Sequence, residues 1–178
     1  MSRKSSINKI KRSNVISKNI DGGLIMYLYQ KGHSPISSHV SHICGLGECD
    51  VISISKSNYI YEHEVKISKS DFKADFKKEK HKLMTERKSV TERLIKENNE
   101  MIKDVWYFIP NYFYFVVPKD LITMEEIPEY AGLIYASEDL NFEIVKKAPL
   151  MHKEKATSNF IRQLSHNLTC KLVFKKID

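Results

Sequence analysis

Two neighbouring runs of β-branched and aromatic residues dominate the pattern of hydrophobic and polar positions. Residues 51–54 and residues 59–67 are rich in Val, Ile and Tyr, and a short polar turn separates them. This composition predicts two strands joined as a hairpin. Because side chains alternate between the faces of a strand, Glu64 and Lys66 share one face. Pairing of the two runs brings Asp50 to the same face, near Glu64.

The rest of the pattern predicts a mixed α/β domain. Helical periodicity covers residues 17–32, residues 71–105 and residues 153–168. Further strand-like runs occupy residues 38–44, 111–117, 132–136 and 142–146. The order is helix, three strands, helix, further strands and a closing helix. We therefore expect a central mixed sheet with helices packed over it and a helical insertion at about residues 83–105.

Positive charge is concentrated at the N-terminus of this 178-residue chain, whose formal net charge is +7. Residues 1–16 contain no acid and carry Arg3, Lys4, Lys9, Lys11 and Arg12. Such an arm can neutralise DNA phosphates and release their counterions. A disordered terminus that serves solubility is an equally favoured interpretation. We expect an arm at residues 1–16 followed by a single domain at residues 17–178.

Hydropathy and cysteine content indicate the compartment. The hydrophobic fraction of 42% is ordinary for a globular protein, and no apolar run is long enough for a transmembrane helix. The polar N-terminus lacks the apolar core of a secretory signal. Three cysteines, an odd number, favour reduced thiols over a disulfide framework. We expect a cytoplasmic protein that does not contact a membrane.

A row of lysines follows the predicted hairpin. If Ser70 caps a helix, a rotation of about 100° per residue aligns four ammonium groups on one side. They belong to Lys69, Lys73, Lys77 and Lys80. Because the row starts beside Lys66, we favour contact with a DNA backbone over an ordinary solvated face.

Asp50, Glu64 and Lys66 form a combination suited to metal-assisted phosphodiester hydrolysis. Two neighbouring carboxylates repel each other, and a divalent cation removes that repulsion. Mg²⁺ and Mn²⁺ take hard oxygen ligands, commonly one or two carboxylates together with waters and a substrate phosphate. A lysine beside the metal can orient and activate the attacking water or stabilise charge on phosphorus.

The spacing of these three residues resembles the core of the PD-(D/E)XK nucleases. The surrounding chain is similar to the signature of the MmcB-like family of DNA-repair proteins. The similar segments are residues 64–66, Ser68, residues 71–72, Asp75, Lys77, and residues 114–118, 128–134 and 143–149. They follow one another in order between about residues 39 and 149. The chain departs from the family between Lys82 and Asn111, where it has far more residues than expected.

This resemblance implies a restriction-endonuclease-like fold and a DNA nuclease that depends on Mg²⁺ or Mn²⁺. Asp50 and Glu64 would bind the metal together with the main-chain carbonyl of Val65, and Lys66 would orient and activate the water. The resemblance also implies that three neighbours matter, namely Ser68, Asp71 and Asp75. The first helix of such nucleases often supplies a further acid, but its only candidate here, Asp21, stays outside the predicted site.

Two other functions stay open at this point. A DNA-binding module on the same fold, without chemistry, explains the basic arm and the lysine row equally well. An assembly protein would use the heptad-like spacing of residues 83–105 to bind a second copy or a partner helix. Packing of the insertion on its own domain is the simpler expectation.

Overall fold

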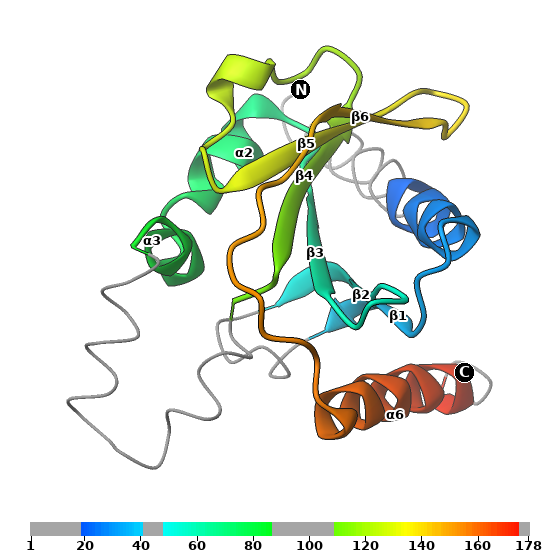
Figure 1. Cartoon of the computed structure of the whole chain (residues 1–178). Helices are drawn as coiled ribbons and strands as arrows, with labels where there is room; N and C mark the ends of the chain where they lie inside the picture. Colours follow the sequence, from blue (N-terminus) through cyan, green and yellow to red (C-terminus); the bar gives the residue numbers. More distant parts are fainter. Residues whose placement is uncertain (1–18, 41–47, 87–108, 175–178) are drawn as a thin grey trace, which may run out of the picture.

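A six-stranded mixed sheet forms the centre of the computed structural model, which describes residues 19–40, 48–86 and 109–174 (Figure 1). Its strand order is β1 to β6 in sequence. The bounds are β1 (Ile36–Val40), β2 (Cys49–Ile54), β3 (Ile60–Val65), β4 (Tyr112–Pro118), β5 (Ala131–Ala136) and β6 (Phe142–Lys146). The first three strands are antiparallel, β4 and β5 continue parallel to β3, and β6 closes the edge antiparallel. The predicted α/β class with a mixed central sheet is confirmed.

Helices cover both faces of this sheet because its strands alternate apolar side chains on both sides. The helix of residues 19–30, blue in Figure 1, packs against Val51, Val65 and Val116 on one face. On the opposite face, α2 (Lys69–Asp75) and α3 (Glu79–Thr85) pack on β4 and β5, where Phe113 and Phe115 point toward them.

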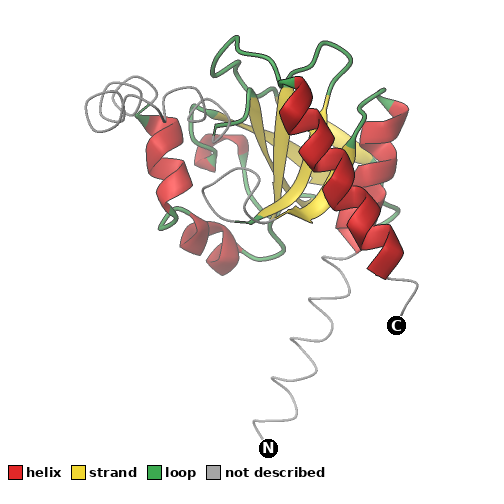
Figure 2. Cartoon of the chain, turned by 90° about the horizontal axis from the view of Figure 1, so that it is seen from below, coloured by secondary structure: helices red, strands yellow, loops and turns green. Residues whose placement is uncertain are grey.

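The closing helix, α6 (Ser158–Phe174), shares that second face. Its Phe160 and Leu164 pack on Ile52 and Ile54 of β2 and on Ile60 of β3. Figure 2 shows α6 crossing in front of the strands. A short 3₁₀ turn, η1 (Met124–Glu126), lies between β4 and β5. The domain therefore has three layers, with the sheet in the middle.

The hairpin of β2 and β3 has the register that the sequence predicts. Val51 pairs with His63, and Ile52 pairs with Glu62. The turn between the strands contains Asn58 with a φ of +63°, a conformation that asparagine tolerates better than most residues. Side chains at even-numbered positions of β3 therefore face α3, and this parity positions the candidate site.

A buried asparagine joins the start of β3 to the segment that leads into α6. Asn111 accepts from the main-chain N–H of Ile60 at 2.7 Å. Its amide group donates to the carbonyls of His152 and Glu154 at 2.9 and 2.7 Å. Three main-chain groups thus find partners on one side chain, which fixes how β3 enters the sheet.

The lysine-rich helix is interrupted, which corrects one expectation. Helix α2 ends at Asp75, and α3 begins at Glu79 after Lys78, whose backbone is extended. The N-cap of α2 is Ser68 rather than Ser70, because the Ser68 hydroxyl accepts from the Asp71 N–H at 3.1 Å. The interruption resets the helical phase, so that Lys80 leaves the predicted row.

Two other boundaries differ from the sequence prediction. The first strand occupies β1 rather than residues 38–44, and residues 41–47 are outside the described ranges. Residues 153–157 are not helical and precede α6, and the Ala156 N–H donates to the carbonyl of Asn58. The predicted arm at residues 1–16 and most of the predicted insertion also lie outside the described residues. Within the described ranges, no helix has the length and apolar character needed to cross a membrane.

Candidate active site

Asp50 and Glu64 face each other across the β2–β3 hairpin. Because Val51 pairs with His63, the same antiparallel register sets Asp50 opposite Glu64. The Asp50 carboxylate also accepts from the main-chain N–H of Val65 at 2.8 Å, from Oδ2 to N. The two predicted acids therefore lie together where β2 begins and β3 ends.

Glu64 is buried among three ammonium groups. Lys66 Nζ donates to Oε1 at 2.9 Å, and Lys78 Nζ donates to the same oxygen at 2.7 Å. Lys80 Nζ donates to Oε2 at 2.7 Å. Burial alone would raise the pKa of Glu64, but the charges of Lys80 and Lys66 outweigh burial and lower it. Glu64 is therefore ionised at neutral pH.

Asp75 forms the other half of this buried network. Its Oδ1 lies 2.9 Å from Lys66 Nζ, and its Oδ2 accepts from His81 Nε2 at 2.6 Å. The pKa of Asp75 is lowered, because hydrogen bonds from His81 and Lys78 outweigh the effect of burial. His81 Nδ1 in turn lies 2.8 Å from the hydroxyl of Tyr130. The chain of contacts runs from Lys66 through Asp75 and His81 to Tyr130.

Lys66 is held as a cation by its two acids. Burial would lower its pKa, but the charges of Glu64 and Asp75 outweigh burial and raise it. A protonated lysine donates hydrogen bonds and stabilises negative charge, but it does not accept a proton. The sequence analysis left both roles open for Lys66, and the arrangement favours the electrostatic one.

Asp21 belongs to the helix of residues 19–30 and lies close enough to Asp50 for its charge to raise the pKa of Asp50. One oxygen of Asp21 is 3.2 Å from His39 Nε2, and the other is buried without a hydrogen-bond partner. Burial is the main cause that raises the pKa of Asp50 to about 7, and the charges of Glu64 and Asp21 add to it. Burial likewise raises the pKa of Asp21. The negative charge on this side of the site is only partly compensated.

These donors fit a hard divalent cation on the side of Asp50 and Asp21. Asp21 is buried and Asp50 is partly buried, both carry raised pKa values, and one Asp21 oxygen has no hydrogen-bond partner. Glu64 differs, because both its oxygens already accept from ammonium groups. The described ranges contain no group of three or more His, Cys, Asp or Glu side chains arranged to hold a metal. A cation that uses Glu64 therefore has to displace an ammonium group.

The predicted DNA-contacting lysines divide into two groups. Lys69, Lys73 and Lys77 are exposed, as a phosphate-binding row requires. Lys80 is buried and donates to Glu62 and Glu64, so its assignment to the row is wrong. The physical reason is the interruption after Asp75, which turns Lys80 toward the sheet.

Two further residues that the resemblance singled out, Ser68 and Asp71, lie at the start of α2. Ser68 caps α2, and Asp71 is an exposed residue in the first turn of that helix. The arm residues Arg3, Lys4, Lys9, Lys11 and Arg12 lie outside the described residues.

Several residues of the network escaped sequence reasoning. Lys78 and His81 give no signal in the sequence, and Tyr130 is marked only as part of the segment 128–134 that resembles the family, because their roles depend on a helix break and on a distant loop. Asp21 is the acid that the sequence analysis places outside the site, although its position on the first helix is the signal that identifies it. Its nearness to Asp50 depends on how that helix crosses the sheet.

Comparison with known proteins adds little to this picture. No family model matches the chain. No curated protein matches it either. Among solved structures, it is similar to a protein of unknown function from Silicibacter pomeroyi, with 16% sequence identity and a TM-score of 0.47. The match covers 79% of this chain and 75% of that protein. A likeness at this level assigns neither a family nor an activity.

Proposed function

We propose that this chain is a metal-dependent deoxyribonuclease of the PD-(D/E)XK type. The observation that carries the proposal is the buried contact of 2.9 Å between Lys66 Nζ and Glu64, beside Asp50 of the neighbouring strand. The element order also supports it, because a helix, three antiparallel strands, further helices and a parallel strand follow one another as expected. The substrate would be DNA in repair, recombination or phage-type DNA processing.

Asp50, Glu64 and the main-chain carbonyl of Val65 would hold Mg²⁺ or Mn²⁺, with Asp21 as an additional acid. When bound, the cation lowers the pKa of a water molecule and neutralises charge on the phosphate. Burial raises the pKa of Asp50 to about 7, and a bound cation would favour the ionised form of this carboxyl group.

Lys66 would act on the charge that develops during hydrolysis. Its ammonium group orients the attacking water by hydrogen bonding and stabilises the phosphoryl oxygens. Asp75 would help to position Lys66, because both Asp75 and Glu64 lie 2.9 Å from its ammonium group. Lys78 is about half exposed and is placed to exchange its contact with Glu64 for a contact with a DNA phosphate. The exposed Lys69, Lys73 and Lys77 would bind the strand.

The engagement of Glu64 favours a second candidate function. Three ammonium groups already compensate this carboxylate, as expected for a DNA-binding module that keeps the fold without chemistry. Such a module would use the same exposed lysines, but it would neither bind a divalent cation nor cleave DNA.

Two measurements distinguish these functions: the rate of DNA cleavage and calorimetric titration with Mn²⁺. Both are made on wild type, on Lys66→Ala and on the control Lys77→Ala. We expect Lys66→Ala to lose about 10²–10³-fold in cleavage rate while retaining Mn²⁺, because it removes a donor that stabilises developing charge. Lys77 is exposed, so Lys77→Ala should cleave at the wild-type rate once DNA is saturating. A wild-type protein that binds no Mn²⁺ and cleaves no DNA structure would favour the binding module. Equal cleavage by wild type and Lys66→Ala would assign the chemistry to other residues.

A further inference from the structure

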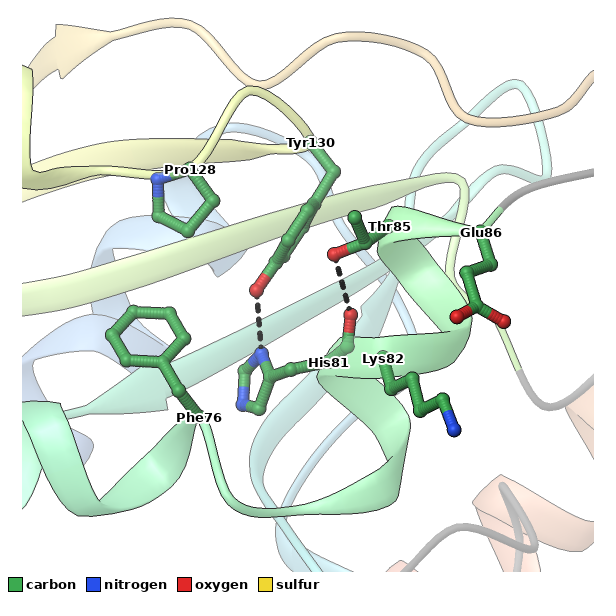
Figure 3. Close-up of a pocket in the computed structure, with 7 residues that line it drawn as sticks. All are labelled: Phe76, His81, Lys82, Thr85, Glu86, Pro128 and Tyr130. Carbon is green, nitrogen blue, oxygen red and sulfur yellow. Dashed lines mark hydrogen bonds between the residues drawn. The ribbon is translucent and has the colours of Figure 1, made fainter.

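A pocket of about 350 Å³ opens beside the network, on the side of α3 (Figure 3). Its lining residues are Phe76, His81, Lys82, Thr85, Glu86, Pro128 and Tyr130. They come from the turn between α2 and α3, from α3 itself and from the loop before β5. The volume lies within the range of pockets that bind small organic groups, and nothing in the candidate chemistry above uses this space.

The walls of the pocket are largely ring systems. The Phe76 and His81 rings have centroids 5.5 Å apart, and the His81 and Tyr130 rings have centroids 6.0 Å apart. Figure 3 shows these rings together with Pro128 around the opening, and Lys82 and Glu86 further along α3. Phe76 is 37% exposed although it is a large apolar residue. His81 and Tyr130 are buried, so Phe76 offers the exposed ring, and an exposed ring face stacks on nucleobases with little preference for base type.

The pocket is joined directly to the candidate catalytic lysine. His81 lines the pocket and contacts Asp75 at 2.6 Å, and Asp75 contacts Lys66 at 2.9 Å. Two side-chain contacts therefore separate the pocket wall from Lys66. The pocket wall and the candidate catalytic lysine therefore belong to one connected cluster of side chains.

In the described part of the chain, lysines outnumber acids around the pocket, which is lined by one acid, Glu86. Lys82 lines it, while Lys77 and Lys78 lie on the turn that follows Phe76. Lys77 and Lys82 are exposed, and Lys78 is about half exposed. A pocket with aromatic walls and lysines nearby offers the two features by which proteins bind single-stranded DNA, namely base stacking and phosphate neutralisation.

We propose that this pocket binds an unpaired nucleobase of the DNA strand whose phosphate occupies the site at Lys66. This inference rests on the proposed function and narrows its substrate class. A base inside a duplex is stacked on both faces and cannot enter such a pocket without leaving the helix. The preferred substrates are therefore DNA strands with an unpaired nucleotide at the scissile position, such as single strands, flaps or mismatched bases.

The test is binding in EDTA, so that neither metal nor cleavage contributes to the result. Fluorescence anisotropy measures the affinity for a labelled oligothymidylate, for its duplex with oligodeoxyadenylate, and for an abasic strand of the same length. We expect wild type to bind the oligothymidylate about tenfold more tightly than the abasic strand. Phe76→Leu keeps an apolar side chain but removes the ring, and it should lose this difference while binding the duplex as wild type does.

Phe142→Leu is the matched control, because Phe142 is a partly buried aromatic residue that packs near Tyr27 on the opposite face of the sheet. It should bind all three DNA probes as wild type does. Equal wild-type affinity for the abasic strand and the oligothymidylate would overturn the proposal without any variant. An unchanged preference in Phe76→Leu would overturn it as well.

The binding result separates this inference from the nuclease proposal. Metal-dependent cleavage of duplex DNA without base-dependent binding would leave the nuclease standing and remove the base pocket. Base-dependent binding that Phe76→Leu abolishes, in a protein that cleaves nothing, would support the pocket on a DNA-binding module.

Discussion

Lys66 and Asp75 form a buried ion pair, with 2.9 Å between Nζ and Oδ1. Asp75 lies on the last turn of α2, and Lys66 follows the last residue of β3, so the pair joins the helix to the sheet. Since Lys66 also contacts Glu64, the position of its ammonium group depends on both acids.

Asp75→Asn should therefore destabilise the fold strongly. The substitution leaves Lys66, Lys78 and His81 without their shared carboxylate, and loss of one partner from a buried pair costs about 3–5 kcal/mol. Asp71→Asn is the control on the same helix, because Asp71 is exposed, and its effect should stay within about 0.5 kcal/mol. Urea unfolding of both variants measures the difference. Equal free energies of unfolding for the two variants would contradict the buried network.

Lys80 and Lys77 should respond in opposite ways to neutralisation. Lys80→Gln leaves Glu62 and Glu64 short of a buried partner, so we expect a loss of about 3–5 kcal/mol in unfolding free energy. Lys77→Gln should leave stability unchanged but reduce the slope of log affinity against log salt by up to about one for a lost phosphate contact. Thermal melts and salt-dependent DNA binding test both. A stable Lys80→Gln variant with a reduced salt slope would restore Lys80 to the DNA-binding row.

Asp50 should make stability depend on pH. Its pKa is about 7 in the folded chain, against an ordinary value of 3.8, so between these values the folded state binds more protons than the unfolded state. The contribution of Asp50 to stability therefore falls as pH rises from about 4 to 7. Asn does not titrate and can still accept from the Val65 N–H.

Asp50→Asn should consequently gain melting temperature relative to wild type as pH increases, with the largest gain above pH 7. Melts at pH 5 and pH 8 measure this change. The same difference in melting temperature at both pH values would mean that Asp50 carries no such raised pKa.

Two glycines provide a matched test of packing. A Cβ on Gly132 would lie 2.4 Å from the ring of Tyr114 and 2.6 Å from the main-chain nitrogen of Ala148. Gly132→Ala should therefore cost about 1–3 kcal/mol. A Cβ on Gly22 meets nothing within 4 Å in its helix, so Gly22→Ala should stabilise by about 0.4–1 kcal/mol. If both variants unfold at the same denaturant concentration, Gly132 is not as closely packed against Tyr114 and Ala148 as these distances indicate.

The strand pattern was sufficient to predict the hairpin and the common face of Asp50 and Glu64. That prediction needed only the alternation of side chains along β2 and β3, which is a local property of the backbone. The helical period was less informative, because it continues through residues 76–78 without a glycine or proline to mark the interruption. Lys80 was misassigned for this reason.

The rest of the site depends on tertiary structure. The burial of Lys80 follows from its pairing with Glu62 and Glu64, and no periodicity indicates that a lysine will be buried. The contact between His81 and Tyr130 joins α3 to the loop before β5, across 49 positions in sequence. The place of Asp21 beside Asp50 likewise depends on how the first helix packs on the sheet.

Cleavage of DNA by wild type and Asp50→Asn, in Mg²⁺, in Mn²⁺ and in EDTA, tests the proposed metal-dependent centre most directly. Asp50→Asn removes one carboxylate charge while preserving the main-chain contact, and Asp71→Asn serves as the surface control. We expect wild type and Asp71→Asn to cleave DNA with either metal and not in EDTA, and Asp50→Asn to be inactive although it is folded. Metal-dependent cleavage by Asp50→Asn at the wild-type rate, or cleavage by wild type in EDTA, would contradict the proposed centre.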